Sequence, residues 1–220
     1  MTDEGAIVAR VRGIMQALPP GTSVIAAAKG RRPEEAMAAL CAGVHGIGHN
    51  YVQEAERMIP LIAQPAEWHM IGHLQRSKVK SAVRLFDMIQ TVDSHELATE
   101  IEKRCAAIGK IMPVLIEVNS GRELSKTGIM PEQTEELARQ ISLMSHLRLQ
   151  GLMTMGPRFG DPENARPFFR LVQELFDHLG KAHLPDIEMR FLSMGMSNSY
   201  RIALEEGANM VRLGTVLFAN

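Results

Sequence analysis

Residues 23–35 read SVIAAAKGRRPEE, and this stretch carries the signals of a strand followed by a helix. The run Ser23–Lys29 has the length and the apolar composition of a buried strand. In the segment Arg32–Glu35, a proline at the first helical turn is followed by two acidic residues, which is typical of a helix N-terminus. A strand followed by a helix is the repeating unit of folds built around a parallel sheet.

The same pattern recurs along the whole chain. Eight apolar runs predict strands, which are Ser23–Lys29, Val44–Asn50, Trp68–Leu74, Met88–Ser94, Met112–Ser120, Arg148–Met155, Phe191–Ser197 and Asn209–Phe218. Eight strand–helix units in 220 residues are close to the minimum for a closed (β/α)8 barrel, which favours this fold over an open doubly wound sheet. We therefore predict an α/β fold with one TIM-type (β/α)8 barrel domain spanning residues 1–220.

The last predicted strand lies close to the C-terminal residue Asn220, so no helix is expected after it. The outer helical layer of the barrel then lacks one member. We expect the N-terminal segment Glu4–Leu18 to fold as a helix and to cover this eighth position.

The composition indicates a small-molecule partner. The chain has 24 Lys and Arg against 25 Asp and Glu, so its charge gives no argument for binding nucleic acid or an anionic membrane. No stretch approaches the roughly 18–20 apolar residues of a membrane helix. Two cysteines, Cys41 and Cys105, are too few for a disulfide framework. We expect a cytoplasmic protein, and because it has no long exposed apolar strand, a monomer.

A lysine closes the first predicted strand, where a barrel carries its reactive groups. Partial burial of Lys29 would favour its neutral amine, which is the form that attacks an aldehyde to make a Schiff base. The alternative is that the Lys29 side chain simply extends into water.

The seventh and eighth predicted strands end in residues that suit an anion. Phe191–Ser199 reads FLSMGMSNS and leads into a short helix at Tyr200–Glu206, so backbone N–H groups and serine hydroxyls converge at a helix start. Arg212–Thr215 adds a glycine, which permits close backbone approach, and a hydroxyl. Phosphate sites in such barrels lie between the loops after strands seven and eight. The sequence therefore predicts a phosphate site opposite Lys29, although two ordinary capped turns would give the same pattern.

Several segments resemble one known family, the YggS/PROSC pyridoxal phosphate homeostasis proteins, in the right order over nearly the whole chain. The most distinctive are NYVQE, WHMIGHLQ and SMGMS. The matching segments are Ala28–Lys29, Gly48–Glu54, Trp68–Lys78, Val118–Asn119, Ser125–Gly128, Gly151–Thr154, Leu192–Ser197 and Val211–Thr215.

This resemblance implies a barrel of the alanine racemase type (fold type III) that carries pyridoxal 5'-phosphate (PLP) as a Schiff base on Lys29. It implies a role in intracellular PLP storage and transfer. It also places Asn50 by the ring and Arg212 at the pyridine nitrogen, where an arginine keeps that nitrogen unprotonated and weakens the ring as an electron sink. The residues it assigns to the phosphate are Ser193, Met194, Gly195, Met196, Ser197, Gly214 and Thr215.

The chain departs from the family pattern in three places. His49 stands where the family usually has Glu, Ala28 stands where it usually has Ser, and the N-terminal segment is short. His49 could place a different charge near the cofactor, or it could point to solvent.

We expect a carrier and no catalytic residues. The resemblance to alanine racemase implies a second base, a tyrosine from a C-terminal domain, whereas Tyr51 and Tyr200 lie in no matching segment. The alternative is a PLP-dependent amino-acid racemase whose partner chain supplies that base. Two further features have no assigned role: Lys126, a second amine near the same rim, and the basic stretch Gln75–Lys80, which could meet a PLP-dependent client enzyme.

A metal-dependent hydrolase is a third possibility, suggested by His45, His49, His69 and His73. Residues i and i+4 of a strand are about 13 Å apart, so neither His45 and His49 nor His69 and His73 can share one ion. A pair across strands, His49 with His73, lacks an evident carboxylate partner. We therefore predict no metal site.

Overall fold

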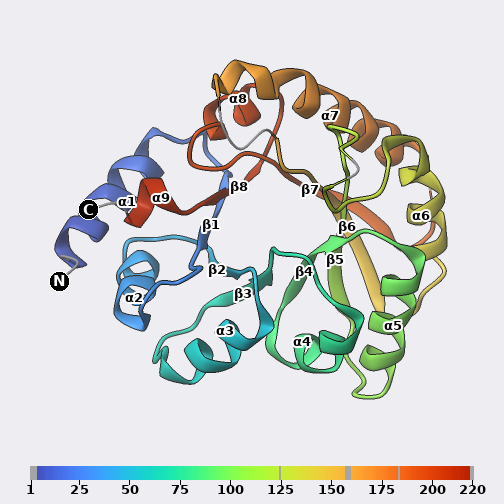
Figure 1. Cartoon of the computed structure of the whole chain (residues 1–220), viewed down its shortest axis with the longest axis horizontal. Helices are drawn as coiled ribbons and strands as arrows, with labels where there is room; N and C mark the ends of the chain where they lie inside the picture. Colours follow the sequence, from blue (N-terminus) through green and yellow to red (C-terminus); the bar gives the residue numbers. More distant parts are fainter. Residues whose placement is uncertain (1–3, 124, 157–159, 183, 219–220) are drawn as a thin grey trace.

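The structure is a computed structural model that describes residues 4–123, 125–156, 160–182 and 184–218. Eight parallel strands form a closed barrel, in which each strand pairs with the next along the chain and β8 pairs with β1 (Figure 1). The predicted (β/α)8 fold is confirmed. The strands are β1 Ser23–Ala27, β2 Gly46–His49, β3 Glu67–Met70, β4 Met88–Val92, β5 Met112–Glu117, β6 Leu147–Met153, β7 Ile187–Ser193 and β8 Met210–Leu213.

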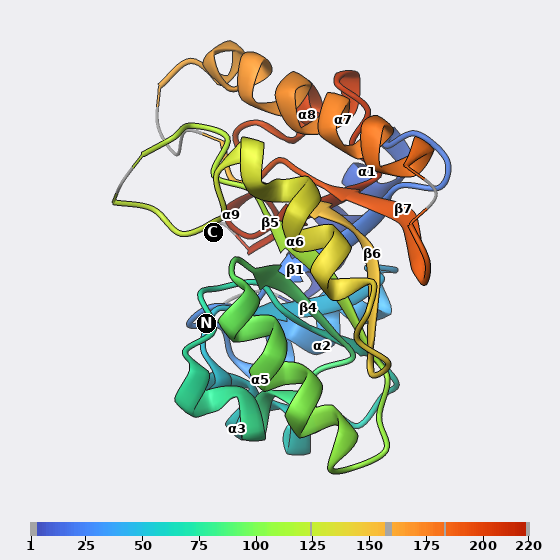
Figure 2. The ribbon, with the colours of Figure 1, turned by 90° about the vertical axis from the view of Figure 1, so that its right-hand side faces the viewer.

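Helices surround the barrel, and Figure 2 shows α5, α6 and α7 lying beside one another on its outside. The signals read from the sequence mark several of their starts: α2 begins at Pro33, and the Ser94 hydroxyl accepts a hydrogen bond from the Leu97 amide at 3.4 Å to cap α5. The helices are α1 Glu4–Ala17, α2 Pro33–Cys41, α3 Val52–Met58, α4 Val79–Leu85, α5 His95–Ala106, α6 Thr134–Ile141, α7 Arg166–Lys181, α8 Tyr200–Glu205 and α9 Thr215–Phe218. Short 3-10 turns lie at Ile59–Leu61, Arg76–Lys78, Pro131–Gln133 and Pro162–Ala165. Among the described residues, no helix is both long enough and apolar enough to cross a membrane.

The end of the chain corrects one prediction. The last strand stops at Leu213, and the four residues from Thr215 form the short helix α9. Helix α1 packs against α2 and α9, as Figure 1 shows, and the Arg10 guanidinium donates to the Leu217 carbonyl at 3.0 Å. The N-terminal helix therefore covers the expected position, but it shares that position with α9.

Side chains inside the barrel form a separate apolar layer. Ile25, Met88, Leu115, Met153 and Met210 pack together there, whereas the larger core lies between the sheet and the helices. Because side chains alternate along a strand, the residue two positions after each of these also faces inward and stands nearer the carboxyl end of the barrel, here called the barrel mouth. The polar residues at these inward positions are Gln90, Glu117 and Arg212, and Ser193 follows the inward Phe191 by two positions.

Candidate functional site

Lys29 lies at the barrel mouth, in the turn that follows β1. The strand ends two residues earlier than the lysine, at Ala27, although the Ala28 amide still donates to the Gly48 carbonyl at 2.9 Å. The chain then turns at Gly30, whose φ is 67°. Lys29 is exposed, and its Nζ lies 5.2 Å from the centre of the Tyr51 ring. The amine is therefore accessible, and the partial burial that we expected is not seen.

The loops after β7 and β8 are joined by one serine. The Ser197 hydroxyl accepts hydrogen bonds from the amides of Gly214 at 3.1 Å and Val216 at 3.2 Å. The Arg212 amide donates to the Gly195 carbonyl at 3.1 Å. Ser197 thus lies against the start of α9 and Gly195 against β8, so the structure brings together the two segments to which the sequence assigns the phosphate.

Gly195 allows the loop after β7 to pack closely against α8. Its φ is 86°, and a Cβ added to it would stand 2.7 Å from both the Tyr200 Cα and the Ala203 Cβ. A side chain would thus collide with α8 in a backbone conformation that L residues rarely adopt. Other predicted phosphate residues differ in exposure, because Met194 is buried in the core while Thr215 is exposed. The Met194 amide donates to the Met210 carbonyl at 3.1 Å, so Met194 offers a phosphate neither its side chain nor its N–H group.

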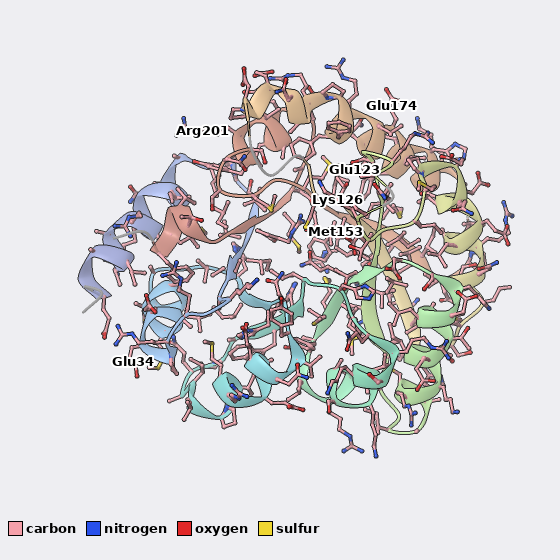
Figure 3. All side chains as sticks on the ribbon, in the orientation of Figure 1. Glu34, Glu123, Lys126, Met153, Glu174 and Arg201 are labelled. Atoms are coloured by element: carbon pink, nitrogen blue, oxygen red, sulfur yellow. The ribbon has the colours of Figure 1, made fainter. Side chains whose placement is uncertain are left out.

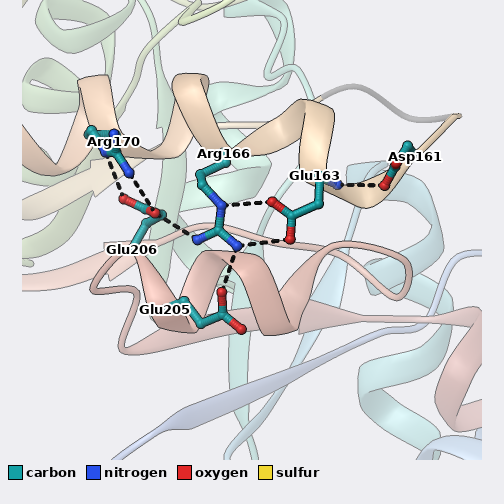
Figure 4. A network of polar contacts seen from close by, with 6 residues as sticks. All are labelled: Asp161, Glu163, Arg166, Arg170, Glu205 and Glu206. Atoms are coloured by element: carbon teal, nitrogen blue, oxygen red, sulfur yellow. Dashed lines mark hydrogen bonds and ion pairs between the residues drawn. The ribbon is translucent and has the colours of Figure 1, made fainter.

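Helix α8, which follows this loop, is tied to the start of α7. Arg166 lies at the centre of the contact and donates to Glu163 at 2.7 and 2.8 Å, to Glu205 at 2.7 Å and to Glu206 at 2.8 Å (Figure 4). Hydrogen bonds to three carboxylates raise the pKa of Arg166. The network fixes α8, and with it the turn that precedes the helix.

Arg212 is the buried cation of the site. Its guanidinium donates to the Ser193 carbonyl at 2.8 Å, to the Ser193 hydroxyl at 2.6 Å and to the Thr154 carbonyl at 2.8 Å. Burial lowers the pKa of Arg212 to about 10, against the opposing charge of Glu117. Arg212 is therefore still a cation at neutral pH, and the ends of β6 and β7 hold its guanidinium in place. The Ser193 hydroxyl thus hydrogen-bonds with Arg212 inside the barrel. It takes no part in the contact between Ser197 and Gly214, which we call the Ser197–Gly214 junction.

A chain of hydrogen bonds continues from Arg212 through the barrel. The Ser193 hydroxyl donates to the Gln90 Oε1 at 2.7 Å, and the Gln90 Nε2 lies 2.8 Å from the His69 Nδ1. An amide nitrogen can only donate, so Nδ1 of His69 accepts and its proton is on Nε2, which faces the Glu67 Oε2 at 3.4 Å. Ser193, Gln90 and His69 are buried. We call these five residues, Arg212, Ser193, Gln90, His69 and Glu67, the barrel relay.

Sequence reasoning missed the barrel relay. His69 was considered only as a metal ligand, and Gln90 was not singled out. The available signal was polarity at an inward position of an otherwise apolar strand, since Gln90 stands in MIQTV. Such a residue must find a buried partner, but the sequence does not say which one.

His49 does not point to solvent. Its side chain is fully buried, its ring stacks on Trp68 at a centroid distance of 5.8 Å, and its Nδ1 lies 3.8 Å from the Glu54 Oε2. Burial lowers the pKa of His49 to about 4. The added Cβ of neighbouring Gly48 would meet Ile25 inside the barrel, so His49 faces the helical layer. The expectation that His49 points to solvent is therefore wrong: His49 is buried, neutral at pH 7 and turned toward the helical layer.

The other histidines have separate partners. The His45 Nδ1 accepts from the Val24 amide at 3.1 Å, and the exposed His73 lies 3.6 Å from Asp93. Within the described ranges, no group of three or more His, Cys, Asp or Glu side chains is placed to hold a metal ion.

The remaining predicted residues lie around the rim. Asn50, directly after β2, is half-buried and lines a pocket of about 320 Å³ together with Tyr51 and Lys78. Figure 3 shows Lys126 beside Glu123, and the Lys126 Nζ lies 2.7 Å from the Glu123 Oε1. Lys126 is therefore paired in its own loop, in contrast to Lys29.

Comparison with known proteins identifies the family. The sequence profile of the alanine racemase N-terminal domain matches residues 2–220. A pyridoxal phosphate homeostasis protein of Aquifex aeolicus is 40% identical, with 80% of this chain and 77% of the relative covered. Another, of Pasteurella multocida, is 37% identical over 93% and 90% of the two chains. PipY of Synechococcus elongatus, solved with PLP bound, superimposes with a TM-score of 0.88 at 28% identity over 97% and 100% of the two chains. The chain belongs to the family of pyridoxal phosphate homeostasis proteins, which share the fold of the alanine racemase N-terminal domain.

Proposed function

We propose that the protein binds PLP at the barrel mouth, as a Schiff base on Lys29, and holds it for intracellular storage and transfer with little or no turnover. The observation that carries this proposal is the meeting of three groups at the carboxyl ends of β1, β7 and β8. These are the exposed amine of Lys29, the Ser197–Gly214 junction and the buried guanidinium of Arg212. Strands β1 and β8 are paired, with Ile25 opposite Arg212, so Lys29 follows the strand next to the one that carries Arg212.

The residues present suit PLP. The glycine at position 195 keeps the loop after β7 close to α8. The β7–α8 loop and the start of α9 offer the hydroxyls of Ser197 and Thr215 to a phosphate, while the Gly214 amide holds the Ser197 hydroxyl in place. PLP supplies an aldehyde, which condenses with a lysine amine with loss of water. Arg212 would face the ring nitrogen, and Asn50 would stand beside the ring.

The site favours holding PLP over turning over amino acids. A cation at the ring nitrogen opposes its protonation, so the ring would stabilise a carbanion poorly. The Lys29 amine lies over the ring of the exposed Tyr51, and the Tyr200 hydroxyl accepts from Arg201 at 3.3 Å, so we expect neither tyrosine to act as the second base. The curated relatives are likewise named for homeostasis and not for a reaction.

Titration with PLP tests the proposal. We expect an absorbance band of the bound cofactor in the wild type and in Lys126→Ala, and loss of that band in Lys29→Ala. Equal binding by Lys29→Ala and the wild type would refute the role of Lys29. Exchange of the α-hydrogen of an amino acid in deuterated water, faster than with free PLP, would instead support the racemase alternative.

We further propose that the protein acts in the cytoplasm as a monomer and passes PLP to PLP-dependent client enzymes. The exposure of Lys29 supports transfer, because it leaves a bound group accessible to a recipient. The two free cysteines support a reducing compartment such as the cytoplasm. Light scattering of the PLP-loaded protein tests the monomer. Reactivation of an apo PLP enzyme by the loaded protein, in the presence of a scavenger of free PLP, tests direct transfer.

A further inference from the structure

Glu117 is a buried carboxyl group with one oxygen that has no partner. It is the last residue of β5, it is 2% exposed, and its Oε1 accepts a hydrogen bond from the Thr127 hydroxyl at 2.7 Å. Its Oε2 is also buried and makes no hydrogen bond with any of the described residues. Leaving such a group unpaired costs free energy, so a buried oxygen of this kind needs an explanation.

The position of Glu117 points to the barrel mouth. It follows the interior residue Leu115 by two positions, so it faces inward. It is level with Met153 of β6, which is level with Ser193 of β7, the residue that holds Arg212. In a closed ring of eight strands β5 stands opposite β1, so Glu117 lies across the mouth from the strand that leads to Lys29.

The loop after β5 fixes this carboxyl group. The Ile129 amide donates to the Glu117 carbonyl at 2.8 Å, and Gly128, with a φ of 102°, turns the chain so that Thr127 reaches the side chain. A Cβ at Gly128 would stand 2.7 Å from the Asn119 amide nitrogen. The sequence Ser125–Gly128, which had no role in the predicted function, thus orients Glu117 and leaves one of its oxygens free.

The surroundings of Glu117 raise the pKa of its carboxyl group above the usual value. Burial raises the pKa of Glu117, the Thr127 hydrogen bond opposes this, Asp93 adds to it, and Arg212 and His73 lower it. A protonated carboxyl group can donate a hydrogen bond as well as accept one. The free oxygen can therefore meet an oxygen atom of a ligand in either form, as an acceptor from a hydroxyl group or, when protonated, as a donor.

The constitution of PLP supplies such an atom. Its ring carries the phosphate arm on one side of the aldehyde and an oxygen on the other. With the phosphate between the loops after β7 and β8, the ring oxygen is turned away from those strands. We propose that Glu117 is a PLP-binding residue, which hydrogen-bonds with the ring oxygen through its free Oε2, and that Thr127 is its positioning residue. This inference rests on the proposed function.

Two substitutions separate a PLP contact from a structural role. Glu117→Gln keeps a donor and an acceptor, so its PLP dissociation constant should stay within about threefold of the wild type. Glu117→Met has a similar length but no hydrogen-bonding group, and a lost hydrogen bond of this kind should weaken binding by about tenfold. The absorbance maximum of bound PLP should shift in Glu117→Met and not in Glu117→Gln.

Thr127→Val and Glu123→Gln are the controls. Glu123 lies in the same loop but pairs with Lys126, so its substitution should leave binding unchanged. If Glu117 served only to anchor the loop, Thr127→Val would weaken PLP binding as much as Glu117→Met, whereas a direct contact predicts a smaller effect. Wild-type affinity in a folded Glu117→Met, or a tenfold loss in Glu117→Gln, would overturn the inference. Failure of the wild type itself to bind PLP would instead refute the proposed function.

Discussion

Replacement of Gln90 by leucine removes the centre of the barrel relay. The Gln90 amide accepts from the Ser193 hydroxyl at 2.7 Å and lies 2.8 Å from the His69 Nδ1, and all three residues are buried. Leucine has a similar size but cannot hydrogen-bond. The substitution therefore leaves the Ser193 proton and the His69 Nδ1 without partners while it preserves most of the packing.

The expected loss of stability follows from these two groups. An unpaired buried donor or acceptor costs about 1–3 kcal/mol, so the two groups left unpaired by Gln90→Leu should lower the free energy of unfolding by about 2–6 kcal/mol. The added hydrophobicity of leucine offsets part of this loss. Arg212 keeps its bonds to the carbonyls of Ser193 and Thr154, so the guanidinium should stay in place. PLP affinity should therefore fall less than stability does.

Urea denaturation of the apo protein at pH 7 measures this effect. Gln140→Leu is the matched control, because Gln140 makes an exposed hydrogen bond to Glu136 at 3.0 Å and its loss should cost no more than about 0.5 kcal/mol. If Gln90→Leu is as stable as Gln140→Leu, the barrel relay contributes nothing and the reasoning is refuted.

Three further predictions concern His49, Gly195 and the cysteines. The pKa of His49 is lowered from 6.5 to about 4, so the unfolded chain binds a proton more readily than the folded protein. As the pH drops from 6.5 towards 4, the free energy of unfolding should therefore fall by about 1.4 kcal/mol per pH unit. His49→Phe should remove this share of the acid sensitivity in urea denaturation at pH 7 and pH 4.5; an unchanged difference between the two pH values would contradict it. Gly195→Ala should lower thermal stability by about 1–3 kcal/mol and weaken PLP binding, because its φ is 86° and its Cβ would meet α8; a variant that matches the wild type in both would show that this loop can rearrange. Burial raises the pKa of Cys105 to about 11, so a thiol reagent should label the exposed Cys41 in the native protein and Cys105 only after unfolding, which peptide mapping can verify.

The apolar runs located all eight strands, but not all of their ends. The first part of β7, Ile187–Arg190, alternates between half-buried and exposed residues, so it lacks the continuous apolar run that marks the rest of the strand. Thr215–Phe218 reads TVLF, which is as apolar as a strand. In the structure this segment is the helix α9, which packs beside α1, and the sequence alone does not predict that contact.

Some residues of the site could be predicted from the sequence and others could not. Lys29 and the segment Met194–Ser197 could be found because each stands at a strand end, in a pattern that suggests its chemistry. The barrel relay could not be found from the sequence, because its hydrogen bonds join residues that are far apart in the chain. His69 and Gln90 are 21 residues apart, and Gln90 and Ser193 are 103 residues apart. The burial of His49 likewise depends on Trp68 of the neighbouring strand.

Reduction of the PLP-loaded protein with borohydride tests the central claim most directly, since it converts a Schiff base into a stable secondary amine. Peptide mapping by mass spectrometry then locates the pyridoxyl group. We predict a single major adduct, on Lys29, with Lys126 unmodified. An adduct spread over Lys126 and surface lysines, with no preference for Lys29, would contradict the account.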